Sequence, residues 1–210
     1  MKRGMCITYE VDGSLYINLT NRCTNNCDFC IRKNGDGAYG SDSLWLEREP
    51  DADEVIASVF SRDVSGYREI VFCGYGEPTM RLSTLSEVAR AIKDKYPSVK
   101  IRLNTNGHSD LVNGEGSVNT LVGLVDTLSI SLNASTPERY CEICHPVHRE
   151  KAFFALIDYA KSAKGKIPSV IFSVVGDSLT EKEISECEKI ARESGVTLRV
   201  RDYIGAEDDK

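Results

Sequence analysis

The feature that most constrains the fold of this chain is a repeated alternation of short apolar strands with amphipathic helices. After residue 68, apolar strand patterns occupy residues 69–74, 100–107, 127–133, 169–176 and 197–204. Helical patterns lie between them at residues 82–96, 117–124, 148–163 and 181–194. Strands that alternate with helices form parallel sheets through right-handed crossovers, with the helices outside. We therefore predict an α/β fold.

The first 60 residues predict a hairpin, a polar segment and one helix. Two apolar runs, 6–11 and 14–20, flank Asp12-Gly13, which is a strong signal for a two-residue β-hairpin. A polar, glycine-rich stretch (33–50) leads into a helical pattern at 55–60. Counting 14–20, the sequence predicts six parallel strands. Six are fewer than the eight of a closed barrel, so the sheet is either open and doubly wound or an incomplete, curved barrel.

Composition fits one ordinary globular domain over residues 1–210. Hydrophobic residues make up 41% and charged residues 28%, and no linker or internal repeat divides the chain. No segment approaches the roughly 18 apolar residues of a membrane span, and no apolar run follows the basic residues at the start. We expect a cytoplasmic protein with no membrane partner. The formal net charge of -6 argues against a broad nucleic-acid surface.

Polar segments follow four of the predicted parallel strands where each strand ends. They read NRCTNNC after the first strand, GYGEPT after the second, NTNG at the end of the third and SLNAS at the end of the fourth. The carboxyl ends of parallel strands meet at one edge of a sheet, and ligands bind there in both candidate architectures. We expect the functional site at this edge.

Three cysteines in the first of these segments have the spacing C-x3-C-x2-C. They are Cys23, Cys27 and Cys30. A structural zinc site wants four ligands, and no fourth lies close by in the sequence. A 4Fe-4S cluster held by three thiolates leaves one iron free for another ligand. In a reducing compartment such thiols are more often ligands than disulfides, so the spacing favours a cluster.

At these residues the chain resembles the radical SAM superfamily, whose motif is C-x3-C-x2-C with an aromatic residue before the last cysteine, here Phe29. The resemblance covers nearly the whole chain and implies a partial (βα)6 barrel with a curved, mostly parallel sheet. It also implies a 4Fe-4S cluster on Cys23, Cys27 and Cys30, with S-adenosylmethionine (SAM) on the open iron. Such an enzyme cleaves SAM reductively to a 5'-deoxyadenosyl radical, which abstracts hydrogen from a substrate that the sequence does not identify.

The resemblance further implies a set of SAM contacts at the strand ends. A glycine-rich turn lets main chain approach a ligand, a carboxylate complements an ammonium group, and short polar side chains suit a carboxylate and a ribose. Residues 173–175 are expected to give apolar contacts to adenine. The predicted SAM residues, with Phe29, are Gly74, Tyr75, Gly76, Glu77, Asn104, Thr105, Ser131 and Asn133.

Within the superfamily, three segments resemble the small TatD-linked radical SAM proteins. They read NLTNRCTNNCDFC, SLNAS and YCEICHPVHREKAF. This resemblance implies a TatD-type nuclease as a genetic or physical neighbour. Since the chain has no flavin motif and no second convincing cluster, we also expect a separate reductant such as ferredoxin or flavodoxin.

Three other functions compete with this interpretation. One is an activase that installs a glycyl radical on a partner protein, because a partial barrel has an open side. Another is a non-catalytic iron-sulfur electron carrier or sensor, which would need no ligand cradle and would normally ligate all four irons. The third is a zinc module.

Several further patterns carry weaker signals. The segment Cys141-Glu142-Ile143-Cys144-His145 matches a haem attachment motif, but we expect no haem because the sequence shows no export signal. We expect instead one of two arrangements. Either the segment is a loop above the active site, with Cys144, His145 or His148 near substrate, or it is a loop with a buried thiol. The G-x-G-x-x-G at 35–40 opens no helix, so a lid or plain loop is expected instead of a dinucleotide site. Arg199 and Arg201 share one face of the last strand and either meet an anionic substrate or form surface ion pairs.

Overall fold

The computed structural model describes residues 3–202, which fold around a seven-stranded sheet whose spatial order follows the sequence from β1 to β7. The strands are β1 (Thr8–Val11), β2 (Ser14–Ile17), β3 (Ile70–Phe72), β4 (Ile101–Thr105), β5 (Thr127–Ser131), β6 (Ser169–Val175) and β7 (Thr197–Arg201). The α-helices are α1 (Ala52–Phe60), α2 (Leu82–Lys95), α3 (Ser109–Asn113), α4 (Pro137–Cys144), α5 (Lys151–Ala163) and α6 (Glu181–Ser194).

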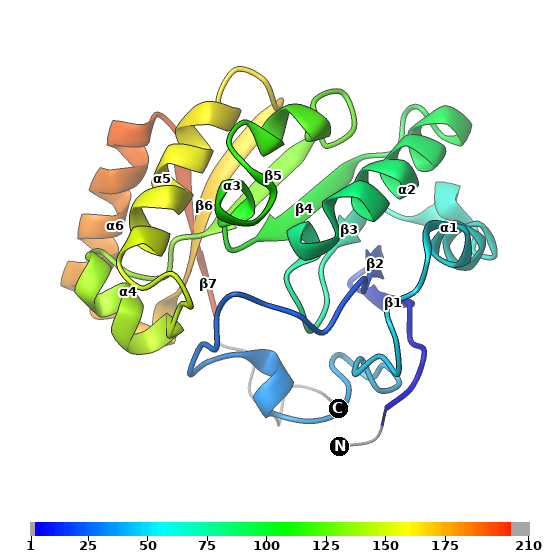
Figure 1. Cartoon of the computed structure of the whole chain (residues 1–210), viewed down its shortest axis with the longest axis horizontal. Coiled ribbons are helices and arrows are strands. Elements are labelled where there is room, and N and C mark those ends of the chain that lie inside the picture. Colours follow the sequence, from blue (N-terminus) through cyan, green and yellow to red (C-terminus); the bar gives the residue numbers. More distant parts are fainter. Residues whose placement is uncertain (1–2, 203–210) are drawn as a thin grey trace.

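The sheet confirms the predicted hairpin and the six parallel strands. β1 pairs antiparallel with β2 around Asp12 and Gly13, both of which have positive φ, as a tight hairpin turn requires. Every later pair, from β2 with β3 to β6 with β7, is parallel. In Figure 1 the sheet curves and stays open, and the helices lie along its outer side, which is the architecture of a partial barrel.

Two of the predicted elements differ from those observed, and two helices were not predicted. The pattern at 117–124 forms a 3-10 helix, η4 (Ser117–Leu121), preceded by the short helix α3. The segment containing Cys141 and Cys144 is helix α4, whose Thr136 caps the first turn and whose Pro137 occupies the first helical position. The helix predicted from 148 begins at Lys151. Of the last predicted strand, residues 203–204 lie outside the described residues.

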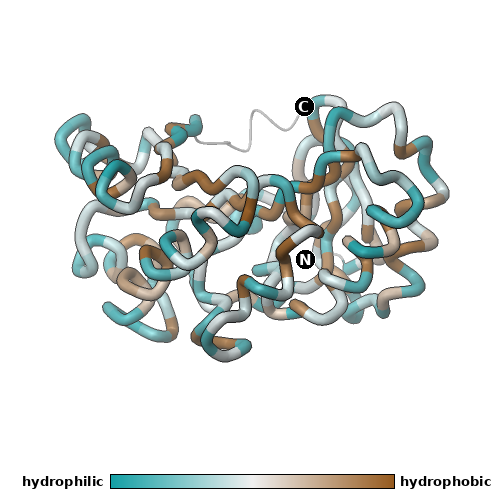
Figure 2. Tube along the Cα trace, turned by 90° about the horizontal axis from the view of Figure 1, so that it is seen from above, coloured by the Kyte–Doolittle hydropathy of each residue, from teal (hydrophilic) through white to brown (hydrophobic). Residues whose placement is uncertain are grey.

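The two faces of the sheet differ in polarity because strand side chains alternate. In β4, Ile101 and Leu103 are fully buried against the helices, whereas Arg102 and Asn104 point to the inner face. In β5, Leu128 and Ile130 are likewise fully buried, whereas Ser129 and Ser131 point to the inner face. In Figure 2 hydrophobic segments run through the middle of the molecule and hydrophilic positions lie along its periphery. The core therefore lies between sheet and helices, and the inner face is left polar.

Within residues 3–202 no helix is both long enough and apolar enough to cross a membrane.

Candidate active site

The carboxyl ends of the strands open into one cavity of about 780 Å³. As expected from the strand order, the four polar segments meet at this edge. All of the predicted cluster and SAM residues line the cavity, namely Cys23, Cys27, Phe29, Cys30, Gly74, Tyr75, Gly76, Glu77, Asn104, Thr105, Ser131 and Asn133. Ser173 and Val175 also line it. A smaller pocket of about 350 Å³, beside Met80 and Asn113, contains none of them.

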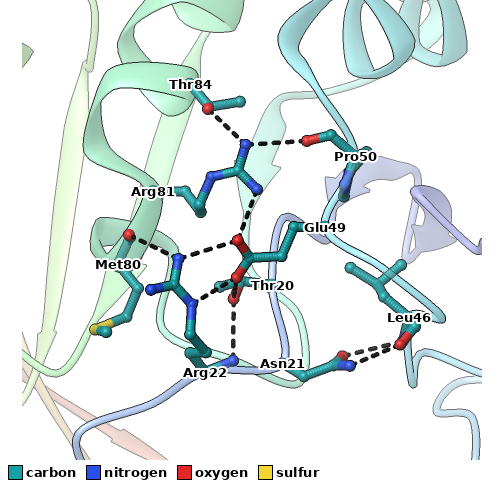
Figure 3. Close-up of polar contacts among 9 residues, drawn as sticks. All are labelled: Thr20, Asn21, Arg22, Leu46, Glu49, Pro50, Met80, Arg81 and Thr84. Atoms are coloured by element: carbon teal, nitrogen blue, oxygen red, sulfur yellow. Dashed lines mark hydrogen bonds and ion pairs between the residues drawn. The ribbon is translucent and has the colours of Figure 1, made fainter.

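The start of the cysteine loop (residues 20–30) is fastened by Glu49. Its carboxylate accepts hydrogen bonds from Arg22 at 2.6 and 3.0 Å and from Arg81, next to the first turn of α2, at 3.0 Å (Figure 3). Burial raises the pKa of Glu49, but hydrogen bonds from Arg22 and Thr20 outweigh it, so the pKa is lowered overall. Asn21 adds two hydrogen bonds to the backbone of Leu46, at 2.8 and 3.0 Å. The loop thus leaves β2 in a fixed direction.

The middle of the cysteine loop is fastened to the end of α4. The backbone N–H groups of Asn26 and Asp28 donate to the carbonyls of Cys144 and Ile143 at 3.0 and 2.9 Å, and the N–H of Val147 donates to Thr24 at 2.9 Å. The last carbonyls of a helix have no partner within the helix, so they are available to accept these bonds. Figure 1 shows the blue segment after β2 crossing the lower side of the molecule toward α4.

A chain of buried side chains supports the same loop from behind. Thr24 Oγ1 lies 2.9 Å from His108 Nδ1, and His108 Nε2 lies 3.1 Å from the hydroxyl of Tyr140. That hydroxyl also accepts from Asn25 Nδ2 at 2.9 Å, and Asn106 Nδ2 donates to Thr24 at 2.8 Å. Burial, assisted by nearby His148, lowers the pKa of His108 to about 3, so this imidazole is neutral near pH 7. A neutral ring supplies one donor and one acceptor, as the chain requires.

The three cysteines of the loop all line the cavity. Across residues 3–202, no group of three His, Cys, Asp or Glu side chains is placed to hold one metal ion. In a cubane each thiolate binds a different iron, whereas a structural zinc site gathers its ligands around one ion. Burial, with the nearby Glu77 carboxylate, raises the pKa of Cys23 to about 12, and burial raises that of Cys30.

Cys27 differs from the other two cysteines because a fourth thiol reaches it. The buried Cys144 thiol, on the last turn of α4, donates a hydrogen bond to the Cys27 sulfur. This bond lowers the pKa of Cys27 and raises that of Cys144. Hydrogen bonds to cluster sulfurs are among the factors that set the potential of an iron-sulfur centre.

The turn after β3 needs its glycines because it packs closely against the segment that leads into the cysteine loop. A Cβ on Gly76 would lie 2.2 Å from the carbonyl oxygen of Thr20 and 2.7 Å from that of Arg22, and a Cβ on Gly74 would lie 2.2 Å from Asn18 Oδ1. The backbone N–H of the next residue, Glu77, donates to Arg22 at 2.8 Å. Only glycine permits this close approach, so the two segments form one wall of the cavity.

Glu77 uses its carboxylate within the protein. Oε1 accepts from the N–H and hydroxyl of Thr79 at 3.0 and 2.8 Å and from the hydroxyl of Thr105 at 2.8 Å, while Oε2 accepts from the N–H of Asn106 at 2.7 Å. Burial raises the pKa of Glu77 despite these bonds. We expected this carboxylate to complement an ammonium group; its observed partners join the ends of β3 and β4.

Three buried amide oxygens of cavity-lining residues have no hydrogen-bond partner among residues 3–202. They are Asn25 Oδ1 in the cysteine loop and Asn104 Oδ1 and Asn133 Oδ1 at the strand ends, and Asn133 also has positive φ, which holds it in a turn after β5. A buried amide oxygen without a donor costs free energy, so an unpartnered one in a cavity wall indicates a ligand donor. SAM carries hydroxyl and ammonium donors that could supply these oxygens with hydrogen bonds. The residues that line the cavity therefore fit SAM, together with a cluster held by the three cysteines.

The glycine-rich 33–50 segment covers one side of the cavity. The hydroxyl of Tyr75 donates to the carbonyls of Gly35 and Gly37 at 3.0 and 2.7 Å, and its ring meets Trp45 edge-on at 5.1 Å. Ala38 and Tyr39 line the cavity. The G-x-G-x-x-G pattern therefore serves a wall segment, in agreement with its failure to open a helix.

The Cys141–His148 segment does not supply cavity residues. Cys144, His145 and His148 are not among the described residues that line the cavity, which is contrary to one of the two expectations. His145 Nε2 instead lies 2.9 Å from Asp28 of the cysteine loop, and Cys144 is the buried thiol of the other expectation. Sequence reasoning missed several lining residues: Tyr16, Asn25, Cys73, Arg102 and Ser129. For Tyr16, Arg102 and Ser129, alternation with apolar neighbours on the strands was the available signal, whereas Asn25 lies in the cysteine loop and Cys73 directly follows β3.

Comparison with known proteins gives one family match and several structural neighbours. The model of the Radical SAM superfamily matches residues 17–190. No curated protein sequence matches the chain. SuiB of Streptococcus suis, solved with S-adenosylmethionine, superposes on 90% of this chain and 38% of its own, with a TM-score of 0.64 and 16% identity.

Two further structures have the same core. A radical SAM methyltransferase of Sphaerobacter thermophilus covers 95% of this chain and 70% of its own, with a TM-score of 0.61 and 16% identity. The FeFe-hydrogenase maturase HydG of Carboxydothermus hydrogenoformans covers 91% and 44%, with a TM-score of 0.56 and 20% identity. At these identities the likeness shows the fold. The chain spans less than half the length of SuiB and HydG.

Proposed function

Because the chain belongs to the radical SAM superfamily, we propose that it is an enzyme that binds a 4Fe-4S cluster through Cys23, Cys27 and Cys30 and places SAM against the cluster. When bound, the cluster supplies the electron that cleaves SAM to methionine and a 5'-deoxyadenosyl radical, which abstracts hydrogen from a substrate. One observation carries the proposal: the three cysteines line the same cavity as three asparagines whose buried amide oxygens have no partner among residues 3–202, and two of these, Asn104 and Asn133, lie at the strand ends.

The protein's own residues have distinct tasks in this function. Glu49 and the end of α4 hold the cysteine loop at both sides, so that the thiols keep their spacing without metal-induced folding. Glycines 74 and 76 bring the turn after β3 against that loop. Asn104 and Asn133 accept hydrogen bonds from SAM. Tyr75 fastens the 33–50 segment, which excludes water from a reactive carbon radical.

The partners follow from the same function. The chain has no flavin motif, so an external reductant such as ferredoxin or flavodoxin supplies the electron. The TatD-linked affiliation, with a TatD-type nuclease as neighbour, also belongs to the proposal and rests on the sequence resemblance alone.

The test is anaerobic. The protein is reconstituted with iron and sulfide, reduced with dithionite, mixed with SAM and assayed for 5'-deoxyadenosine. We expect cleavage by the wild type and by Cys141→Ala, a control that removes a thiol outside the cavity, and none by Cys27→Ala. Iron-sulfur absorbance without SAM binding or 5'-deoxyadenosine would instead indicate an electron carrier or sensor. Zinc without sulfide would indicate a zinc module.

A further inference from the structure

One partly buried cation of the cavity, Arg201, has no carboxylate to pair with among the residues that the structure describes. Arg201 stands at the end of β7, next to Val175 of β6 in the register of the sheet, and lines the same cavity as the three cysteines. Among residues 3–202, no carboxylate lies within ion-pair distance of its guanidinium, and its Nε is buried without a hydrogen-bond partner. A cation taken out of water without a partner is costly, so the position is unfavourable for the protein alone.

The other charged groups in the cavity do not relieve this charge. Arg102 already donates to Glu69 at 3.0 Å and to the hydroxyl of Tyr16 at 3.3 Å. The carboxylate of Glu77 is fully engaged by four donors. The remaining charged lining residues, Arg68, Arg199, Asp12 and Asp202, are exposed to solvent. Within residues 3–202, Arg201 is therefore the one positively charged lining residue that is neither ion-paired nor exposed to solvent.

The neighbours of Arg201 describe the kind of subsite it belongs to. Burial lowers its pKa from the usual range, although a guanidinium stays protonated at any physiological pH. The groups that influence it electrostatically include Cys73 at the end of β3, Tyr39 of the 33–50 segment and Tyr16 of β2. Arg201 therefore lies among hydroxyl and thiol groups that line the cavity, beside Val175 of β6.

We propose that Arg201 binds a carboxylate group of the substrate. The inference rests on the proposed function, since it assigns the substrate class of the same cavity. A carboxylate matches the planar edge of a guanidinium with two parallel hydrogen bonds, one of which would satisfy the buried Nε. A single free cation balances a single negative charge. A phosphate monoester carries nearly two negative charges, and its second charge would have only the solvent-exposed arginines of the cavity, Arg68 and Arg199, to pair with.

A stability measurement tests whether Arg201 is free in the protein without substrate. Arg201→Met keeps the aliphatic length and removes the unpaired charge, so we expect an unchanged melting temperature or a rise of up to about 2–4 °C, the shift of roughly 1 kcal/mol in a chain of this size. Arg192→Gln, which alters only an exposed ion pair on α6, serves as control. A clear fall in the melting temperature of Arg201→Met alone would show that Arg201 has a structural partner and would overturn the proposal.

A labelling experiment tests the ligand. The reconstituted enzyme, with saturating SAM, is treated with phenylglyoxal, and labelling of each arginine is followed by peptide mass spectrometry. The probes are propionate, propionamide and ethylphosphonate at equal ionic strength. We expect propionate to slow labelling of Arg201 several-fold, propionamide to have no effect and ethylphosphonate to protect less, while labelling of Arg192 stays constant.

Three outcomes would overturn the inference. Equal labelling with propionate and propionamide would exclude a carboxylate subsite. Stronger protection by ethylphosphonate would indicate a phosphoryl group. Slower labelling of Arg201 with SAM alone than in a parallel sample without SAM would assign Arg201 to the cofactor. The assay for 5'-deoxyadenosine on the same wild-type sample separates failure of the proposed function from failure of the subsite. If propionate protects Arg201 but no 5'-deoxyadenosine forms, the radical SAM function is refuted and an anion site remains. If 5'-deoxyadenosine forms but propionate does not protect, the carboxylate subsite is refuted.

Discussion

The two sides of the cavity differ in how their polar groups are satisfied. Behind the cysteine loop, Thr24, His108 and Tyr140 form a continuous chain of hydrogen bonds in the buried interior. On the inner face of the sheet, Arg201 Nε, Arg102 Nε and Asn104 Oδ1 are buried without partners. On the loop side, Asn25 Oδ1 is also unpartnered, and it too belongs to a residue that lines the cavity.

This difference separates residues that build the site from residues that await a ligand. A satisfied buried network rigidifies its surroundings, and removing one member leaves others unpaired. An unsatisfied buried group lowers the stability of the free protein, and a ligand that supplies the missing partner removes this cost on binding. Mutations of groups in the satisfied network should therefore cost stability, whereas mutations of the unpartnered groups should cost binding.

The largest effect is expected at Glu77. Glu77→Ala leaves four donors without an acceptor, from Thr79, Thr105 and Asn106, and each unsatisfied buried donor costs about 1–3 kcal/mol. Loss of the desolvated charge offsets part of this, so we expect a net loss of about 3 kcal/mol in the free energy of unfolding, measured with urea. Glu87→Ala, at an exposed position on α2, should stay within about 0.5 kcal/mol. Equal values for the two variants would place Glu77 on the ligand side.

The next effect is expected at Tyr140, which lies in the middle of the buried chain. Tyr140→Phe removes only the hydroxyl, so Asn25 Nδ2 and His108 Nε2 lose their shared partner. We expect a loss of about 1–3 kcal/mol in urea unfolding and a lower yield of cluster on reconstitution. A variant as stable as the wild type would show that water or a rearranged side chain satisfies both groups.

These networks mark the limit of what the sequence predicts. The strands and the edge where they end follow from local patterns, because an apolar run or an alternation is contained within a few residues. His108 and Tyr140 gave no signal, since their partners lie 84 and 32 residues away. Helix α4 escaped prediction because it is short, yet Thr136 before Pro137 was a usable start signal. For Arg201 the sequence shows only that it shares a face of the last strand with Arg199. That its guanidinium has no carboxylate nearby among residues 3–202 could be seen only in the structure.

A smaller effect, dependent on pH, is expected from His108. Its pKa is about 3 in the folded protein and about 6.5 when exposed, so the unfolded chain binds more protons between these values. Stability is therefore lost as the pH falls below about 6.5, by about 1 kcal/mol between pH 6.5 and 5.5 from this group alone. Urea unfolding of wild type and His108→Gln over that range measures it. The variant should be less stable at pH 7 but lose less on acidification, and parallel curves would show that His108 titrates normally.

The smallest change in stability is expected at Asn104, for which the chain offers a matched partner two residues away. Asn106 Oδ1 accepts from the N–H of His108 at 3.0 Å and its amide donates to Thr24, so Asn106→Ala should cost about 1–3 kcal/mol. Asn104→Ala removes an oxygen that has no partner, together with a weak hydrogen bond to Cys73, and should change the free energy of unfolding by less than about 0.5 kcal/mol.

For SAM binding the order of the two variants should be reversed, with Asn104→Ala showing the larger loss of affinity. Equilibrium dialysis of SAM against the reconstituted variants measures it, and Asn104→Ala should weaken binding about tenfold, the loss expected for one hydrogen bond of roughly 1.4 kcal/mol. If Asn104→Ala instead destabilises the protein as much as Asn106→Ala and leaves SAM affinity unchanged, the inner face is as structural as the loop side. An unpartnered buried oxygen would then be a poor guide to the ligand, and Arg201 would have to be judged by its labelling alone.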